Sequence, residues 1–299
     1  DTVDAYVRGE TDFALLRFVP DLIVDADGIA ALDMTVRGAL DAPAFDGSIA
    51  FERARIAPRG LGTSIFFGPG RVAIGDGRMR VTEDAPLSGT LFGGDFTAWG
   101  DVGLRGLTPA SVDFHMFVTN LAYRVPNVAS VTITSENLRF LAPDLATPST
   151  WWLTGDITLV DGRYFDTIDV VSSSVSFGGF GRTVESFSLP VWMTVPTLGA
   201  INADLAIRGR DRFRVENTIA TAALDMEFRT DLRLTGTFGA MVLLGELEAL
   251  PLGTVTYRGR TFDTQSVRLS FRGARDPYGY PMPYLDAEMT AAIRPCVRR

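Results

Sequence analysis

Apolar and polar side chains alternate with a period of two in several short runs of the chain. In one run Phe114 and Met116 alternate with Asp113, His115 and Phe117. Successive side chains of a β-strand point to opposite faces, so each run would have one apolar and one solvated face. This pattern is typical of a mostly antiparallel sheet. The apolar positions that share one side of such runs are Phe96, Ala98, Val102, Leu104, Val112, Phe114, Met116, Val118, Ala222, Leu224, Met226, Phe228, Leu285, Ala287, Met289 and Ala291.

Turn residues separate these runs every few positions, since the chain has 30 glycines and 16 prolines. Gly68–Gly70 and Gly75–Gly77 are predicted to form hairpin turns, and residues 177–183 a loop. The only helix signal runs from Thr11 to Val19, with Thr11 or Asp12 as its cap and Pro20 at its end. We expect this helix to close one end of the sheet. The alternative, a helix on a membrane surface, would call for a more basic polar face.

A weak internal repeat links distant parts of the chain. Residues 36–51 and 234–249 share glycines at matching positions, and residues 153–159 give a partial third copy. The spacing is irregular, so the pattern does not indicate a solenoid of fixed period. It indicates a sheet that grows by repeated hairpins. We therefore expect residues 1–299 to form a single extended β region, with a candidate minor boundary at Pro143–Thr150.

Composition and charge exclude some classes of protein. With 46% hydrophobic residues the chain can build a core, and its net charge of -8 disfavours nucleic acid as a partner. The sequence starts at Asp1 without an apolar run of about 18 residues. We therefore expect the chain to be a piece of a longer protein, whose N-terminal membrane anchor lies outside it.

Residues for common catalytic chemistry are scarce. Cys296 is the only cysteine, His115 is the only histidine, and all 28 basic residues are arginines. This excludes multi-histidine or thiolate metal sites, a P-loop lysine and Schiff-base chemistry. Aligning Gly28 with the glycine of a calcium loop puts Ile23 and Met34 where acidic ligands are needed. We expect a protein that is not an enzyme and binds neither metal nor cofactor, with His115 on a solvated strand.

Two further groups of residues have a structural and a functional interpretation. The alternating arginines from Arg208 to Arg214 fit a solvated strand end, or a contact with anionic lipid headgroups or a partner. Trp151 and Trp152 are adjacent, so in a strand they would face opposite ways, one buried and one half-exposed. A core role is favoured for them over a platform for a ligand.

One short helix cannot cover the apolar face of so many strands. The sheet must therefore close into a barrel or sandwich, or curl around its own apolar face. A curled open sheet would leave a hydrophobic trough, and exposed apolar surface of this kind usually binds lipid or a partner.

The order of the glycine, proline and apolar positions resembles the C-terminal domain of the TamB family, the AsmA-like translocation and assembly module proteins. The C-terminal part of the resemblance rests on Gly253, Tyr257, Gly259, Phe262, Leu269, Phe271, Pro283 and Leu285. Earlier parts are residues 13–20 with Gly28, 36–38 with Pro43 and Gly47, 89–106, 153–155 with 162–164, and 204–217 with 232–236. The chain departs at Met241, where the family often has proline, and at its end, since family members usually continue further.

The resemblance implies an all-β fold, an elongated and curved, mostly antiparallel sheet (a β-taco, or open trough) with an apolar interior and one short helix. It also implies a periplasmic protein tethered to the inner membrane. The implied partners are phospholipid, an outer-membrane barrel protein of the TamA type and nascent outer-membrane proteins.

Three functions remain open. The first is a non-enzymatic conduit that carries phospholipid acyl chains in the trough. The second is a chaperone-like scaffold for outer-membrane proteins such as autotransporters, which would pair with an exposed sheet edge. The third is a plain structural or adhesin-like β domain. For the conduit, the residues assigned to the lipid-binding trough are Phe96, Val102, Leu104, Phe114, Met116, Val118, Ile157, Leu159, Leu205, Leu224, Met226, Phe228, Leu269, Phe271, Leu285 and Met289.

Overall fold

The computed structural model describes residues 2–14, 23–39, 42–59, 61–106, 108–125, 129–164, 196–219, 222–251, 253–257, 260–275 and 281–290. In this part of the chain seventeen strands form one sheet. The strands are β1 (Thr2–Asp12), β2 (Ile23–Ala39), β3 (Ala42–Pro58), β4 (Ile65–Phe67), β5 (Gly70–Gly75), β6 (Arg78–Val81), β7 (Leu87–Leu91), β8 (Gly94–Arg105), β9 (Thr108–Val125), β10 (Ala129–Ala142), β11 (Trp152–Tyr164), β12 (Asn202–Ile219), β13 (Ala222–Thr237), β14 (Ala240–Ala249), β15 (Thr254–Tyr257), β16 (Arg260–Arg275) and β17 (Pro281–Thr290).

The strands follow one another across the sheet almost in chain order. We call each position in this order a row. Most rows hold one strand, and three rows hold two short strands each, namely β4 with β5, β6 with β7, and β14 with β15. Among the described strands, β11 and β12 make the only parallel pair, in which Trp152 lies beside Asn202. Helical structure here is limited to 3-10 turns at residues 13–14 and Pro148–Thr150 and to the short helix α2, Pro196–Gly199. The expectation of an all-β, mostly antiparallel sheet is confirmed.

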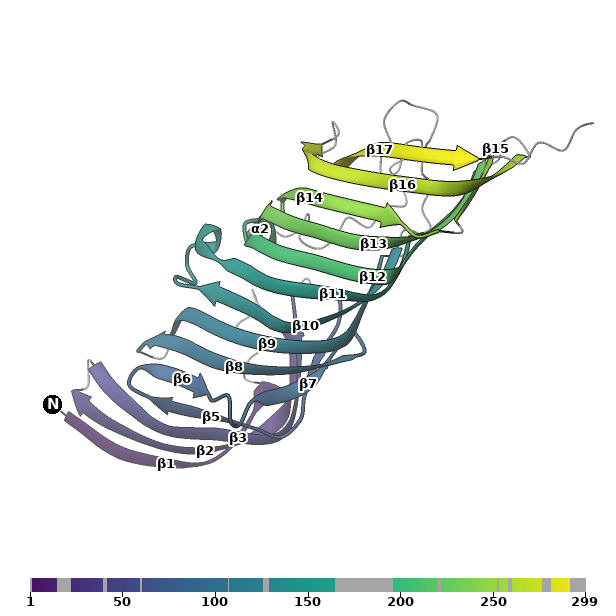
Figure 1. Cartoon of the computed structure of the whole chain (residues 1–299). Helices are drawn as coiled ribbons and strands as arrows, with labels where there is room; N and C mark the ends of the chain where they lie inside the picture. Colours follow the sequence, from purple (N-terminus) through teal and green to yellow (C-terminus); the bar gives the residue numbers. More distant parts are fainter. Residues whose placement is uncertain are drawn as a thin grey trace, which may run out of the picture.

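Figure 1 shows the strands stacked side by side from β1 to β17, with the long strands bending along their length. The fourteen rows, at about 4.8 Å between neighbours, give the sheet a length of roughly 60 Å along the stacking direction. The result is an elongated, curved sheet that has one inner and one outer face.

The inner face carries the apolar half of the alternating pattern. Cross-strand pairing continues this face from row to row: Phe96 lies opposite Val118, and Leu205 lies opposite Leu234. Phe228, which is 1% exposed, sits at the centre of the most buried part of this face. Burial of a phenylalanine side chain contributes about 1.5–3 kcal/mol. Apolar burial on this one face therefore adds to the backbone hydrogen bonds that join neighbouring strands.

The outer face carries arginines and carboxylates that pair across strands. Arg139 and Asp113 lie on neighbouring strands and make two hydrogen bonds, of 2.8 and 2.7 Å. Because opposite charges on neighbouring strands attract, these pairs favour the observed register, although each exposed pair contributes only about 0–1 kcal/mol. The other pairs between strands are Arg37–Asp4, Arg55–Asp25, Arg80–Asp101, Arg208–Asp156, Arg214–Asp225, Arg229–Glu248, Arg233–Asp204, Arg268–Glu246 and Arg268–Glu248.

One glycine conformation, with a close contact to the next strand, recurs within the strands. Gly100 has φ 147°, and a Cβ added to it would lie 2.0 Å from the carbonyl oxygen of Asp113 on the next strand. Only glycine permits such a conformation together with such a close approach. Gly47, Gly155 and Gly245 have φ of 151°, 143° and 109° and are approached in the same way by the carbonyls of Asp33, Asn137 and Asp231.

The internal repeat seen in the sequence is thereby explained. Gly47 and Gly245 are the matching glycines of residues 36–51 and 234–249, and each belongs to a hairpin, β2–β3 or β13–β14. Gly155, in the partial third copy, has the same backbone conformation. The repeated unit is a hairpin in which a glycine inside one strand is closely approached by a backbone carbonyl oxygen of the neighbouring strand.

Two local predictions were wrong, at least in part. Thr11 and Asp12 belong to β1, whereas Phe13 and Ala14 form a 3-10 turn, and the Asp12 carboxylate accepts a hydrogen bond of 2.7 Å from the Ala14 amide. Residues 15–22 of the predicted helix lie outside the described part of the chain. Gly68–Gly70 is not a hairpin turn, because β4 and β5 on either side of it both pair with β3. It interrupts one row.

Other local predictions were confirmed. Gly75–Gly77 does turn β5 into β6, with Asp76 and Gly77 at φ 52° and 66°. Trp151 is 9% exposed and donates a hydrogen bond from Nε1 to the carbonyl oxygen of Asp144 at 2.9 Å, whereas Trp152 is 43% exposed. The loop predicted at residues 177–183 and Cys296 lie outside the described residues.

Candidate functional site

The inner face brings apolar side chains together in two large clusters. The first lies mainly on β8 to β13 and contains Phe96, Ala98, Val118, Leu138, Ala203 and Leu205, with Phe67, Phe114, Met116 and Ile157 packed against them. The second lies on β11 to β16 and contains Tyr164, Val215, Met226, Phe228, Leu247, Val267, Leu269 and Phe271. Both belong to one sheet, so the candidate site is a long apolar surface rather than a single pocket.

The sixteen residues assigned to the trough from the sequence fall into three groups. The buried ones are Phe96, Val118, Leu205, Met226, Phe228, Leu269 and Phe271. The half-buried ones are Val102, Leu104, Phe114, Met116, Ile157 and Leu159. Leu224, Leu285 and Met289 lie in β13 and β17, but their side chains lie outside what the structure describes. Ten of the sixteen are members of the two clusters or pack against them.

The inner face keeps accessible apolar surface at β9. Met116 lies between Ala98 of β8 and Leu138 of β10, and it remains half-buried. Phe114 lies opposite Gly100, which has no side chain to cover it. Small residues beside large ones thus leave apolar surface of Phe114 and Met116 accessible. The buried members of both clusters are 1–9% exposed, so the accessible apolar surface comes from the half-buried side chains packed against them.

An aromatic row that the sequence reasoning missed continues the inner face toward the N-terminus. Phe13, Phe51, Phe67 and Phe96 contact one another edge to face, with ring centroids 5.5, 6.4 and 5.5 Å apart. Phe96 was assigned to the inner face from the sequence, but the row was not, because its members are distant in the chain. Phe67 lies in the three-residue strand β4, which is too short to give a periodic signal.

Electrostatics on the outer face follow from its ion pairs. Hydrogen bonds from Arg139, Arg233 and Arg214 lower the pKa of Asp113, Asp204 and Asp225, respectively. In Asp204 the two carboxylate oxygens accept from Arg233 at 2.7 and 2.8 Å. The charged form of each carboxylate is favoured, so this face stays ionised well below neutral pH.

These lowered pKa values predict a small loss of stability in acid. An ion pair whose carboxyl pKa is lowered by folding contributes stability above the ordinary value of about 3.9, and this contribution is lost as pH falls through the folded-state pKa. We expect the urea midpoint to fall between about pH 5 and about pH 3. Asp204→Asn should be less stable at pH 7 by about 0–1 kcal/mol, with a flatter dependence on pH. Parallel curves for variant and wild type would contradict this role.

The other candidate residues from the sequence make contacts that fit a structural role. His115 lies on the outer face and stacks on Trp99, with ring centroids 5.7 Å apart. Arg208 and Arg214 pair with Asp156 and Asp225, consistent with the solvated-strand interpretation. Within the described ranges no group of three or more histidine, cysteine or acidic side chains is arranged to hold a metal ion. The helices of the same ranges include none with the length and hydropathy of a membrane span.

These features define a class: an elongated single-sheet β protein with an apolar inner face and a charged outer face. Residues 87–295, more than half of the chain, match the family model of the TamB C-terminal domain. The chain therefore belongs to the TamB family, a non-enzymatic family of the translocation and assembly module of outer-membrane biogenesis. The family is associated with the cell envelope and with an outer-membrane partner of the TamA type.

The lead-in residues of the family resemblance, 13–47, lie outside this match. Comparisons with curated proteins and with solved structures found no match.

Proposed function

We propose that this chain is a segment of a non-enzymatic lipid conduit, which binds phospholipid acyl chains along its inner face and passes them between the inner and outer membranes. The observation that carries the proposal is the continuity of the apolar inner face across the sheet. Row after row pairs an apolar residue with another apolar residue or glycine, as in Phe96 with Val118 and Leu205 with Leu234. Such a path can accept an alkyl chain at any point along its length.

The energetics favour acyl chains as the occupant. Each methylene moved from water to an apolar surface contributes about 0.8 kcal/mol. The inner face offers the half-buried Phe114, Met116 and Ile157 for this contact. A charged headgroup would remain at the rim in water, because removing an unpaired ion from water is costly. The trough would therefore select for chains and tolerate different headgroups.

Location and partners follow from family membership and are part of the proposal. The chain would act in the periplasm, in a protein tethered to the inner membrane. Its partner would be an outer-membrane barrel protein of the TamA type. Phospholipid would then move along the sheet toward that barrel.

A second candidate is a chaperone-like scaffold for nascent outer-membrane proteins. It is favoured by β1, which among the described strands pairs only with β2 and leaves its other edge open. β17 likewise pairs only with β16 in that part of the chain. An open strand edge presents unpaired backbone groups that a nascent strand can join.

Lipid analysis of the purified 299-residue chain tests the two candidates against each other. For the conduit we expect phospholipid to co-purify and to be detected by mass spectrometry after denaturation. Native mass spectrometry should show it bound with a discrete mass increase. A protein that is free of phospholipid and takes none up from mixed vesicles, yet binds an unfolded outer-membrane protein, would favour the scaffold and rule out the conduit.

A further inference from the structure

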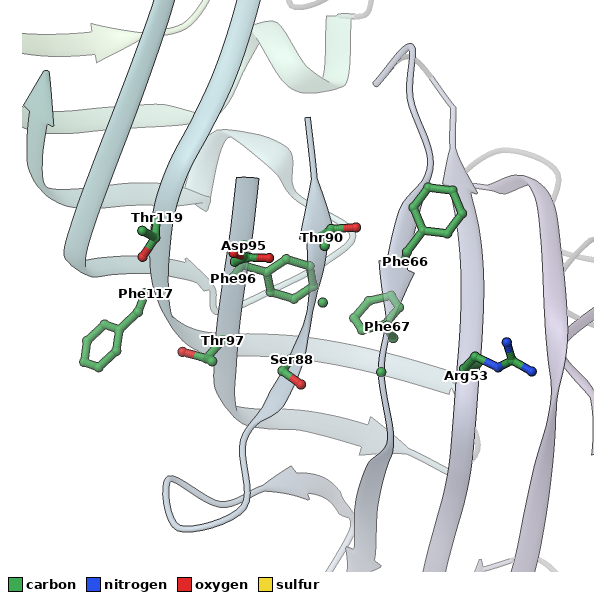
Figure 2. A pocket seen from close by; sticks show the side chains of 12 residues that line it. Arg53, Phe66, Phe67, Ser88, Thr90, Asp95, Phe96, Thr97, Phe117 and Thr119 are labelled. Atoms are coloured by element: carbon green, nitrogen blue, oxygen red, sulfur yellow. The ribbon is translucent and has the colours of Figure 1, made fainter. Parts of the chain in front are cut away.

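The outer face has a hollow of its own, whose lining also includes Phe67 and Phe96 of the inner-face cluster. It lies over β3, β4, β7, β8 and β9 and has a volume of about 510 Å³. Figure 2 shows Phe66 and Phe117 at opposite ends, with Ser88, Thr90 and Thr97 between them. The volume is within the range of small-molecule sites, about 300–1,000 Å³. We call this hollow the outer groove.

The ends of the outer groove are aromatic and exposed. Phe66 is 51% exposed and Phe117 is 44% exposed. Trp99 contacts the Phe117 ring edge to face, with centroids 4.9 Å apart, and Trp99 in turn stacks on His115. Phe117 is thereby held in place before any ligand arrives. Its strand and that of Phe66 are three strand spacings apart, about 14 Å.

Hydroxyl groups lie on the floor of the groove, beside Gly68, Gly89 and the apolar Phe67 and Phe96. Cross-strand pairing aligns Thr90 with Asp95 and Thr97 with Ser88, and Thr119 lies beside Asp95. Their side chains make no hydrogen bond to any residue that the structure describes. Their donors and acceptors are therefore available to a ligand.

The groove holds one charge of each sign. Arg53 and Asp95 line it, and neither is ion-paired within the described residues. Around it the outer face is paired across strands: Arg55 binds Asp25, Arg80 binds Asp101 and Arg139 binds Asp113. The groove therefore breaks the ion-pair pattern of its surroundings and offers a near-neutral set of free polar groups.

These groups limit the chemical class of ligand that the outer groove can bind. An alkyl chain in the groove would cover hydroxyls without replacing their hydrogen bonds to water, which is unfavourable. A phosphate group would call for more than the single cation Arg53. A peptide strand could not pair with the floor, whose strands are already paired on both sides. A pyranose has apolar C–H faces that stack on aromatic rings and hydroxyls that bond to serine, threonine, carboxylate and guanidinium groups.

We propose that the outer groove binds a neutral oligosaccharide, with sugar rings against Phe66 and Phe117 and their hydroxyls bonded to the floor. This site goes beyond the conduit function and does not depend on it. It would give the protein a glycan contact on the face opposite to the lipid path.

Titration of the 299-residue chain with three neutral tetrasaccharides tests the site. The probes are tetra-N-acetylchitotetraose, cellotetraose and maltotetraose, followed by calorimetry and by saturation-transfer NMR. We expect saturable binding of at least one of them. Phe66→Ala and Phe117→Ala should each weaken that binding about tenfold, because each removes one ring contact. Thr97→Val, which keeps the shape and removes the hydroxyl, should weaken it about three- to tenfold.

The controls separate this site from the trough and from loss of folding. Leu244→Ala removes an exposed apolar side chain of β14, which does not line the groove, at a residue that is 38% exposed, and should leave sugar binding unchanged. Thermal melting should show all four variants folded. No saturable binding of any probe, or binding unaffected by both phenylalanine variants, would overturn the proposal. It would also be overturned if Phe66→Ala and Phe117→Ala reduced binding to phosphatidylcholine vesicles instead of sugars.

Discussion

The Met116→Asp variant is expected to fold but to carry no phospholipid. Met116 is half-buried on the inner face, packed beside the cluster of Phe96 and Leu205, so a carboxylate there keeps part of its hydration. The cost to stability should be roughly 1–3 kcal/mol, less than for a fully buried ion. An acyl chain passing this point would have to strip water from the carboxylate, and binding should fall below detection. Co-purified phospholipid, quantified by mass spectrometry, is the measurement.

The matched control is a carboxylate on the opposite face. His115, one residue away, is unsuitable because it stacks on Trp99 and lies near Asp113. Thr158 is better: it is exposed on the outer face of β11, and its neighbour Ile157 points to the inner face. Ile157→Asp should behave like Met116→Asp, whereas Thr158→Asp should bind lipid and melt like the wild type.

Each outcome has a clear meaning. If both inner-face variants unfold while Thr158→Asp folds, the inner face at β9 and β11 is a closed core and the open-trough proposal fails. If Met116→Asp folds, retains phospholipid and restores function when placed in the full-length protein, the lipid path does not pass this strand. A folded variant without lipid that also fails to complement supports the conduit.

Gly100→Ala is expected to destabilise the protein by about 2–6 kcal/mol. The φ of 147° costs an L-residue about 1–3 kcal/mol. The added methyl group would lie 2.0 Å from the Asp113 carbonyl oxygen and 2.9 Å from the Phe114 Cα, so the β8–β9 pair must separate at a further cost of about 1–3 kcal/mol. Because domains are stable by only about 5–15 kcal/mol, this loss should lower the urea midpoint markedly.

Gly9→Ala is the control for this substitution. Gly9 lies in β1, has no atom within 4 Å of the position that a Cβ would take, and does not have a left-handed φ. We expect its replacement to be neutral or slightly stabilising, because alanine has less freedom in the unfolded chain. Equal urea midpoints for Gly100→Ala and wild type would show that the carbonyl approach can relax without cost.

Alternation in the long strands was sufficient to predict the fold class and much of the inner face. Phe96, Val118, Met226 and Phe228 were assigned from period two alone, and all are buried there. Gly68–Gly70 misled the prediction because a glycine-rich break inside a row resembles a hairpin turn until its partner strand is known. Pairing depends on residues distant in sequence, which local patterns do not encode.

The outer groove was beyond sequence reasoning for a related reason. Phe66 and Phe117 are 51 residues apart in the chain, and nothing in their local patterns relates them. Ser88 and Thr97 lie between these two rings only because β4, β7, β8 and β9 are neighbours in the sheet. Periodicity placed Phe117 on the same face as Asp113 and His115, but it gave no reason to connect this residue with Phe66.

The in-strand glycines have a consequence for how such a protein can change in length. Each hairpin meets only its two neighbours, and the glycine–carbonyl contact at Gly47 recurs at Gly245 nearly two hundred residues later. Inserting or deleting a hairpin with this contact would lengthen or shorten the sheet by about 10 Å and leave its cross-section the same. The span of the molecule is thus adjustable in whole hairpins, independently of what its two faces bind.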